Sequence, residues 1–465
     1  MERFDVAVIG GGTAGPSAAR GAQARGMSVA VIEEDRFGGD CLWWACVPTK
    51  ALLECARVFT QTQQAEAFGT LAEHVRLDFA RVQARKQAVI DRIAEHDDPK
   101  HLVQDGIRVY RAHAAFRSPH ELQVGEETIQ AEHIVLAVGA RARIPPIPGI
   151  AQVPYLTNVT AIALPELPAS LLILGGGPVG CEFAQMFARF GVKVTLVQSE
   201  THLLPREDVD AAAAVEAVLA RDGITILTNT KAVQVARHDG QIVLTVQRGG
   251  QEQQLVGEQL LIATGREVPL DGLQIEAAGL ARTKRGLEVG DTLQTNVEHI
   301  WACGDAAGKM LFTHVAENQG QHVGRNLGLA APAPWDGRVV PRCTFLEPEV
   351  ASVGLTEAQA AAQYDIVVGQ VPFTASDRAI IQDETDGFVK IVAHRADGQV
   401  LGGHIVGPRA GDLIHELALA MAARTPVKQV GAMIHLYPAL LDPLRWAAQE
   451  AEAKRGQPGA EQQAA

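Results

Sequence analysis

Two cysteines, Cys41 and Cys46, lie in the segment Gly38-Gly-Asp-Cys-Leu-Trp-Trp-Ala-Cys-Val-Pro-Thr-Lys50. On a regular α-helix, positions i and i+5 lie about 140° apart, so a disulfide between these thiols requires a bent or unwound first helical turn. The glycines and the proline of the segment permit that departure, because glycine tolerates unusual dihedrals and proline sits well near a helix start. Lys50 adds a fixed cation that favours a thiolate or a reduced cofactor. The spacing alone leaves open a redox pair, two buried thiols or half of a zinc site.

Composition limits the classes of partner. The 465 residues suffice for about two to four domains. A formal net charge of −13 disfavours nucleic acid and anionic membrane surfaces. No apolar run approaches the roughly 18 residues of a membrane helix, and the N-terminus lacks a signal-peptide pattern. With six cysteines and no regular disulfide framework, we expect a cytoplasmic protein, in which a persistent disulfide is usually catalytic or redox-sensing.

A dinucleotide-binding motif occupies the N-terminus. The turn Gly10-Gly-Gly12-Thr13-Ala14-Gly15 follows a predicted strand at 5–9 and opens a predicted helix, and Glu33 ends the next predicted strand, 29–32. In such a unit the glycines let the backbone approach a pyrophosphate, the helix N-terminus supplies its dipole, and the acid binds a ribose hydroxyl. The placement of the motif between strand and helix makes it specific.

A second copy of the motif follows. The turn Gly175-Gly-Gly177-Pro178-Val179-Gly180 lies between a predicted strand at 171–174 and a predicted helix at 181–190. The next predicted strand, 193–197, ends at Gln198, which stands at the ribose position in place of an acid. One such turn could be merely a tight connection, but two well-placed copies predict two bound dinucleotides.

The rest of the sequence predicts further strands for the two dinucleotide-binding units and an additional domain after them. Strands are predicted at 134–139 and 260–265, each ending in glycine, and at 300–302 before Gly304-Asp305. Residues 144–149 have the composition of an inter-domain linker. Helical spacing over 59–104 predicts long structural helices packed on the first domain. After about residue 339, strands at 350–353, 388–392 and 400–406 and a helix at 411–423 predict an α+β domain, and the polar tail 456–465 is expected to be disordered.

Together these motifs resemble the flavin-dependent pyridine nucleotide–disulfide oxidoreductases, which include dihydrolipoamide dehydrogenase, glutathione reductase and mercuric reductase. The resemblance spans residues 3 to 452. It implies an α/β fold with two Rossmann-like domains, for FAD and for NAD(H) or NADP(H), and a C-terminal α+β domain that forms a homodimer. The implied boundaries are 1–148 and 271–338 for FAD, 149–270 for the nicotinamide cofactor and 339–455 for dimerisation.

The resemblance also implies site roles. Electrons would pass from the nicotinamide to the flavin and on to a Cys41–Cys46 disulfide, with Cys46 against the flavin as charge-transfer thiolate and Cys41 exchanging with substrate. Lys50 and Glu182 match the family's ion pair beside the reactive flavin nitrogen. No metal site is expected. The implied cofactor-binding residues are Gly10, Gly12, Thr13, Ala14, Gly15, Glu33, Gly39, Asp40, Lys50, Ala114, Ala137, Gly139, Gly175, Gly177, Pro178, Val179, Gly180, Glu182, Gln198, Gly265, Arg266, Gly304, Asp305 and Thr313.

The chain departs from the family near its C-terminus. Where the family has His-Pro-Thr-x-x-Glu, whose histidine is acid/base toward the exchanging thiol across the dimer, this chain has Tyr437-Pro-Ala-Leu-Leu-Asp442. A phenol has a reference pKa of about 10 against about 6.5 for imidazole, so Tyr437 is a poor base at neutral pH but can donate a hydrogen bond. His435 could substitute, or it could be an interface residue. Trp43 and Trp44 beside the thiols could be core packing or could narrow the substrate mouth.

Three hypotheses about the substrate follow. The first is a dihydrolipoamide dehydrogenase-like enzyme acting on a lipoyl group or another disulfide. The second is a mercuric reductase-like enzyme, although no cysteine follows Cys343 to form a C-terminal metal-delivering pair. The third is a redox-sensing or binding flavoprotein with weak turnover. Because no Arg or Lys lies between Gln198 and Pro205 to hold a 2′-phosphate, NADH is favoured over NADPH.

Overall fold

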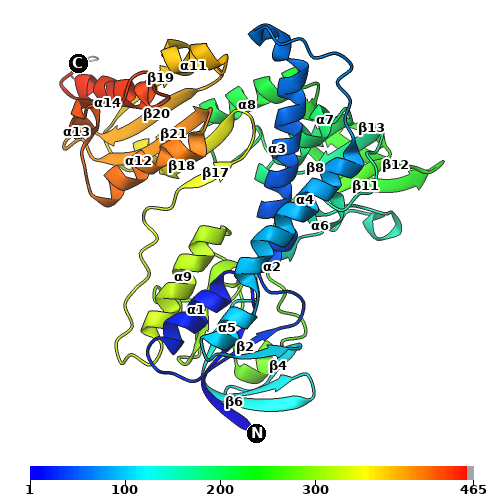
Figure 1. The fold of residues 1–465 in the computed structure, drawn as a ribbon, viewed down its shortest axis with the longest axis vertical. Helices are drawn as coiled ribbons and strands as arrows, with labels where there is room; N and C mark the ends of the chain where they lie inside the picture. Colours follow the sequence, from blue (N-terminus) through cyan, green and yellow to red (C-terminus); the bar gives the residue numbers. More distant parts are fainter. Residues whose placement is uncertain (458–465) are drawn as a thin grey trace.

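The computed structural model describes residues 1–457 and contains three packed units (Figure 1). The first unit is built on a sheet of order β3-β2-β1-β6-β5-β4, in which β16 also pairs with β6. Its strands are β1 (Glu2–Ile9), β2 (Val29–Glu33), β3 (Arg108–Arg111), β4 (Ala114–Ser118), β5 (Glu121–Val124), β6 (Glu127–Leu136) and β16 (Ile300–Ala302). The β1, β2, β3, β6 and β16 pairings are parallel, whereas β4, β5 and β6 pair antiparallel.

Two helices far apart in the sequence, α1 (Ala14–Gln23) and α9 (Thr313–Asn326), lie side by side on this unit (Figure 1). They approach so closely that a Cβ on Gly21 would lie 3.0 Å from the Cα of Gly324. Residues after 271 therefore return to complete the first unit, and the N-termini of both helices reach the same edge of its sheet.

The second unit has a parallel sheet of order β10-β9-β8-β14 and an antiparallel sheet of order β11-β12-β13. The strands are β8 (Ser170–Leu174), β9 (Lys193–Val197), β10 (Thr225–Leu227), β11 (Thr230–His238), β12 (Gln241–Arg248), β13 (Gln251–Gly257) and β14 (Gln259–Ile262). Its helices are α6 (Asn158–Ala161), α7 (Pro178–Arg189) and α8 (Val209–Arg221). The chain passes from the first unit to the second after β7 (Arg141–Ala142) and returns after β15 (Arg266–Glu267). These two short strands pair antiparallel.

The third unit is an antiparallel sheet of order β17-β18-β21-β20-β19 with helices packed on it. The strands are β17 (Arg342–Thr344), β18 (Glu349–Gly354), β19 (Ile366–Pro372), β20 (Phe388–His394) and β21 (Val400–Gly407). The helices are α10 (Glu357–Ala361), α11 (Asp377–Gln382), α12 (Ala410–Ala422), α13 (Val427–Ala432) and α14 (Asp442–Arg455). The predicted α+β character after residue 339 is confirmed.

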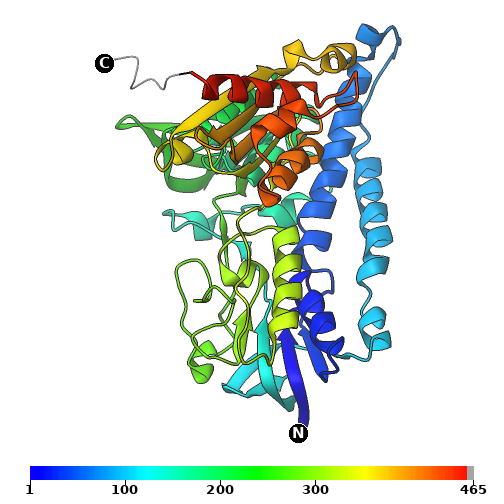
Figure 2. The same ribbon diagram turned by 90° about the vertical axis from the view of Figure 1, so that its left-hand side faces the viewer.

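The helices after the cysteine segment correct one prediction. They are α2 (Gly39–Trp43), α3 (Cys46–Gln63), α4 (Phe79–Ala94) and α5 (Lys100–Gln104), and α3 and α4 run side by side along the molecule (Figure 2). The expectation that residues 59–104 pack on the first unit is wrong for α4, because its buried residue Val82 shares a core with the second unit. It holds for α5, whose Leu102 lies in the core of the first unit. Phe79 on α4 packs edge-to-face on Phe190 with ring centroids 6.0 Å apart.

The remaining short elements are turns of 3-10 helix. They lie at Ala65–Phe68, Glu95–Asp97, Ile150–Gln152, Ile275–Ala278, Gly304–Ala307 and Phe373–Ala375. Within residues 1–457, no helix has the length and hydropathy needed to cross a bilayer. The disorder expected for 456–465 concerns mostly residues 458–465, which lie outside the described chain.

Candidate active site

The first glycine turn is a tight cradle between β1 and α1. Gly10 has φ +118°, and a Cβ there would lie 2.3 Å from the carbonyl oxygen of Ala137, while a Cβ on Gly15 would lie 1.9 Å from the carbonyl oxygen of Gly10. Glu33 accepts a hydrogen bond from the backbone N–H of Gly11 at 2.6 Å. Only glycine fits these positions, which leaves the turn and the start of α1 bare for a pyrophosphate.

The second turn repeats this geometry between β8 and α7. A Cβ on Gly175 (φ +112°) would lie 2.4 Å from the carbonyl oxygen of Ala263, and a Cβ on Gly180 would lie 1.8 Å from that of Gly175. Gln198 takes the place of the acid: its Oε1 accepts from the N–H of Gly176 at 3.4 Å, and its Nε2 donates to the carbonyl of His202 at 3.4 Å. The Gln198 amide is thus turned into its own loop and is buried.

A partly buried arginine, Arg266, connects the cradle of the first unit with the cysteine segment. The Arg266 guanidinium lies 2.8 Å from Asp40 and 3.6 Å from Asp305, and its Nε has no hydrogen-bond partner among residues 1–457. Burial raises the pKa of Asp305. The side-chain oxygen of Gln319 accepts from the N–H of Gly304 at 2.8 Å, and its side-chain nitrogen also lacks a hydrogen-bond partner in the described part of the chain. Orphaned donors beside the glycine cradle fit a large polar cofactor such as FAD.

The two cysteines lie on either side of a helix break. The chain leaves helical geometry after Trp43 and re-enters it at Cys46, and both thiols are reduced in this structure. This is the interruption of regular helix that a bridge between these positions requires. The Cys46 sulfur lies 3.4 Å from the Thr313 hydroxyl at the start of α9.

The paired thiols share one proton unequally. A hydrogen bond from Cys41 is the largest influence that lowers the pKa of Cys46, which falls to about 6, and Thr313 and Lys50 act in the same direction. The pKa of Cys41 is raised, first by that same hydrogen bond and then by burial. At neutral pH Cys46 is therefore the thiolate and Cys41 keeps the proton.

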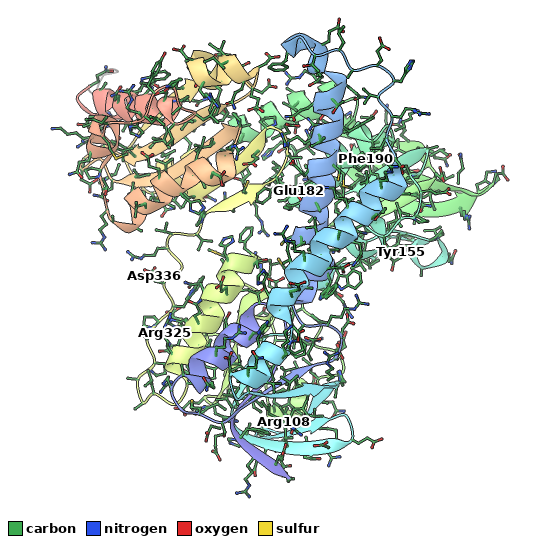
Figure 3. All side chains as sticks on the ribbon, viewed as in Figure 1. Arg108, Tyr155, Glu182, Phe190, Arg325 and Asp336 are labelled. Carbon is green, nitrogen blue, oxygen red and sulfur yellow. The ribbon has the colours of Figure 1, made fainter. Side chains whose placement is uncertain are left out.

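Lys50 on α3 and Glu182 on α7 form an ion pair that a residue of the third unit also contacts. The Lys50 ammonium on α3 donates to both carboxylate oxygens of Glu182 on α7, at 3.0 and 2.8 Å. Glu182 is labelled in Figure 3. Phe345, just after β17, donates its N–H to the same carboxylate at 2.8 Å, and its ring centroid lies 4.7 Å from the ammonium. Phe345 was not singled out in the sequence, which indicated only that it lies near the start of the implied dimerisation domain, 339–455.

The tryptophans beside the cysteines have different surroundings. The Trp43 indole donates to the carbonyl of Phe37 at 2.7 Å, and the Arg36 guanidinium lies 4.9 Å from the Trp43 ring and 5.6 Å from that of Trp44. Trp44 packs against the core shared with the second unit, and its carbonyl accepts from the amide of Asn158 at 2.9 Å. Trp44 therefore serves core packing.

The C-terminal candidates point in different directions. The His435 side chain is 2% exposed, with Nε2 3.0 Å from Glu416 on α12 and Nδ1 3.0 Å from the carbonyl of Met433. Tyr437 is 66% exposed and donates its hydroxyl to Asp377 at 2.5 Å, a bond that raises the pKa of the phenol. Asp442 is buried and accepts from the N–H of Ala439 at 3.2 Å. The partners Glu416 and Asp377 lie on distant elements and gave no local signal in the sequence.

The other predicted cofactor residues are distributed over both units. Positive φ angles occur at Gly39, Gly139, Gly265 and Gly304, Ala114 lies buried on β4, and Pro178 and Val179 open α7. Their roles, like those of Thr13 and Ala14 at the start of α1, stay predictions.

Comparisons with known proteins agree with this arrangement. The family model "Pyridine nucleotide-disulphide oxidoreductase" matches residues 4–320, and the model of that family's dimerisation domain matches 340–448. The chain belongs to this family. It is therefore an FAD- and NAD(P)-dependent disulfide oxidoreductase with a dimerisation domain.

Individual members of the family are similar over nearly the whole chain. A dihydrolipoyl dehydrogenase of Bacillus subtilis (strain 168) is 34% identical over 97% of this chain and 98% of its own length. A mercuric reductase of Streptomyces lividans is 35% identical, covering 96% of each. The solved structure of the HOCl-induced flavoprotein disulfide reductase RclA from Escherichia coli superposes with a TM-score of 0.85 at 30% identity, over 96% of this chain and 99% of that one. A Cu(II) complex of RclA gives a TM-score of 0.87.

Proposed function

We propose that this oxidoreductase moves electrons through Cys46 and then Cys41 to a small disulfide, with a lipoyl group as the first candidate. The observation that carries the proposal is the unequal thiol pair: Cys46 is held as thiolate by Cys41, Thr313 and Lys50, and Cys41 remains the protonated partner. Bound FAD supplies the capacity to accept hydride from a nicotinamide and to pass electrons on to a disulfide.

The residues of the chain divide the work between the two cradles. Gly10, Gly12 and Gly15 would hold the FAD pyrophosphate at the start of α1, with Glu33 on the ribose, and Asp305 would face the ribitol chain. Gly175, Gly177 and Gly180 would hold the nicotinamide dinucleotide. The ammonium of Lys50, fixed by Glu182 and covered by Phe345, would stabilise negative charge that develops beside the thiols during reduction.

The exchange with a disulfide substrate follows from the protonated state of Cys41 and the thiolate state of Cys46. Once Cys41 loses its proton, its sulfur attacks one sulfur of the substrate disulfide, and the other substrate sulfur leaves as a thiolate that takes up a proton. The Cys46 thiolate then attacks Cys41, which re-forms the Cys41–Cys46 disulfide and releases the second substrate sulfur. Two electrons pass to the substrate, and two protons are taken up by its thiolates.

A metal-ion substrate is the second candidate, favoured by the C-terminal geometry. The Tyr437 hydroxyl is directed at Asp377 and His435 is turned toward Glu416, so neither presents a free base at the surface. Thiol–disulfide exchange benefits from such a base, whereas electron delivery to a thiolate-bound metal ion needs none. The mercuric reductase relative and the Cu(II) complex of RclA are consistent with this candidate.

The test is a direct comparison of acceptors. Lipoamide, glutathione disulfide, Hg(II) and Cu(II) are assayed with NADH and with NADPH, in the wild type and in Cys41→Ser. We expect lipoamide turnover that disappears in Cys41→Ser. Turnover of the metal ions alone would replace the first candidate by the second, and turnover of none would favour a redox-sensing role.

A further inference from the structure

A short segment contacts the second glycine turn at one end and the third unit at the other. It comprises residues 203–208, which precede α8 and which we call the strap. Leu203 and Leu204 at its start are at most 1% exposed. Helix α8, which the strap enters, lies beside β21 of the third unit (Figure 1). The strap therefore links the second cradle to a different unit of the chain.

The first end of the strap orients one peptide group of the glycine turn. The N–H of Leu204 donates to the carbonyl of Gly176 at 2.8 Å. Because the peptide between Gly176 and Gly177 is planar and trans, its N–H points opposite to that carbonyl, away from the strap. Among residues 1–457, this N–H of Gly177 has no hydrogen-bond partner. Leu204 thus directs a free donor at the start of α7, where a helix N-terminus favours a phosphate.

Leu204 itself is in a strained conformation that its neighbours must maintain. Its φ of +47° lies in the left-handed region, which costs free energy for a residue with a Cβ. The carbonyl of Leu204 accepts from the N–H of Glu207 at 2.8 Å. The conformation of Leu204 therefore depends on where Glu207 is held.

The third unit holds Glu207. Arg342 on β17 donates to both of its carboxylate oxygens, at 2.7 and 3.1 Å, and Ser352 on β18 donates its hydroxyl at 2.6 Å. Arg342 and Ser352 face each other across the pairing of β17 and β18. The Glu207 side chain is only 7% exposed, so these charge-assisted bonds replace most of its contact with water. Asp208 adds a second attachment, because it accepts from the N–H of Glu357 at 3.1 Å.

The first cradle has no such dependence on the third unit. Its corresponding carbonyl, that of Gly11, accepts from the N–H of Gly38 at 2.9 Å. Gly38 has φ +92°, which a glycine adopts without strain, and it follows β2 of the same unit. A change at the contact between the strap and the third unit should therefore affect the second cradle and leave the first intact.

We propose that Arg342 is a positioning residue for the nicotinamide coenzyme, acting from the third unit through Glu207 and the strap on the N–H of Gly177. The inference rests on the proposed function, in which the second cradle holds the coenzyme pyrophosphate. Loss of the guanidinium leaves a buried carboxylate without its charged partner, and the strap shifts so that water can reach it. A shifted Leu204 releases the carbonyl of Gly176, and the N–H of Gly177 is no longer directed at the phosphate.

The test measures anaerobic flavin reduction by stopped-flow absorbance, which needs no electron acceptor. The donors are NADH, NADPH and 1-benzyl-1,4-dihydronicotinamide, which carries no phosphate. In Arg342→Met we expect the half-saturating coenzyme concentration to rise about 3- to 10-fold at an unchanged limiting rate, because a uniform binding contact is lost. The rate with the phosphate-free donor should equal that of the wild type. Arg342→Lys keeps one of the two bonds to Glu207 and should recover part of the loss.

Two further variants separate this effect from a general loss of structure. Arg338→Met is the matched control, because Arg338 precedes β17 but is exposed and paired with Asp336. It should behave as wild type. Glu207→Gln keeps the shape of the side chain and removes its charge, and should raise the half-saturating concentration about 3-fold even if Arg342→Met fails to retain flavin. Unchanged coenzyme binding in flavin-loaded Glu207→Gln, or an equal loss with the phosphate-free donor, would overturn the inference.

The inference and the proposed function fail in different ways. Gly177→Val fills the open side of the second cradle and should raise the half-saturating coenzyme concentration at least about 10-fold, because a pyrophosphate needs close approach to the backbone. If Gly177→Val has no effect, the second cradle does not hold the coenzyme and the proposed function is wrong on that point. If Gly177→Val weakens binding while the Arg342 and Glu207 variants do not, only the positioning role of Arg342 is refuted.

Discussion

The two dinucleotide cradles share one backbone geometry but differ in the protein atoms that lie against the glycine turn. Added Cβ atoms would strike equivalent carbonyl oxygens in both turns, at Gly10 and Gly175 and again at Gly15 and Gly180. In the first cradle, however, Gly39 of the cysteine segment lies against Gly12. Apart from its chain neighbours, no atom of residues 1–457 lies within 4 Å of the corresponding Cβ position at Gly177. The same turn is thus covered in one unit and open in the other, as a retained cofactor and an exchanging one require.

The cradles also differ in the residue at the end of the strand that follows the helix, β2 in the first unit and β9 in the second. Glu33 and Gln198 both accept from a backbone N–H of their turn, at 2.6 and 3.4 Å, but only Glu33 brings a charge. The structural hydrogen bond is therefore retained without a carboxylate, and the second cradle has neither a charge to repel a 2′-phosphate nor one to bind a ribose hydroxyl strongly.

A side chain added at Gly39, where the cysteine segment lies against the first cradle, should have the largest effect of the predicted changes, a loss of FAD affinity. Its Cβ would lie 2.8 Å from the Cα of Gly12 at φ +59°, so Gly39→Val should push the cysteine segment off the cradle. We expect at least about a 100-fold loss of FAD affinity, because both the steric clash and the left-handed backbone oppose a branched side chain.

The matched control is Gly177→Ala in the open cradle. It should leave flavin content intact and raise only the KM for the nicotinamide coenzyme. Stoichiometric flavin in purified Gly39→Val, measured by absorbance and by titration of apoprotein with FAD, would show that Gly39 does not cover the first cradle.

Removing the Lys50 cation should have the next largest effect, on the rate of reduction by the coenzyme. Lys50→Met leaves the Glu182 carboxylate without its ammonium partner, and we expect coenzyme-dependent reduction to slow by about 10²-fold, the usual effect of losing one preorganised charge. Stopped-flow absorbance measures that rate. Lys100→Met, at a surface lysine paired with Asp98, is the control and should behave as wild type.

The thiolate of Cys46 predicts a defined pH dependence. Because the pKa of Cys46 is lowered to about 6, the thiolate persists at neutral pH and is lost as the pH falls through that value. Cys41→Ala removes the largest stabilising hydrogen bond, so the midpoint should move to higher pH. Thiolate absorbance of the reduced protein records the titration, and a midpoint near that of an ordinary thiol in the wild type would disprove the assignment.

The smallest expected effect concerns the charge at residue 198. Gln198→Glu restores the carboxylate of the first cradle in the second, so the kcat/KM ratio of NADH to NADPH should rise by about 3- to 10-fold through repulsion of the 2′-phosphate. Gln198→Asn keeps the position neutral and serves as the control. An unchanged ratio in Gln198→Glu would mean that the adenine ribose lies elsewhere.

The sequence predicted the features that local geometry determines. The glycine turns, the following Glu33 and Gln198, and the interruption between Cys41 and Cys46 depend on residues close together in the chain. The predicted packing of α4 on the first unit was wrong, because an amphipathic pattern tells which face of a helix is buried but not which unit buries it.

The missed residues share a different property. Phe345 reaches the Lys50–Glu182 pair from the third unit, and Asp377 reaches Tyr437 from sixty positions away. Contacts made by single residues across units leave no periodicity or spacing in the sequence, so only the folded chain can identify them.

The central claim is that reducing equivalents from the open cradle reach Cys46 beside the covered one. Anaerobic titration with NADH, followed through the long-wavelength band of a thiolate against oxidised flavin, tests it most directly. The wild type should develop the band after two electrons, Cys41→Ser should show it without reductant because Cys46 is then free, and Cys46→Ser should never show it. A band that persists in Cys46→Ser would contradict the account.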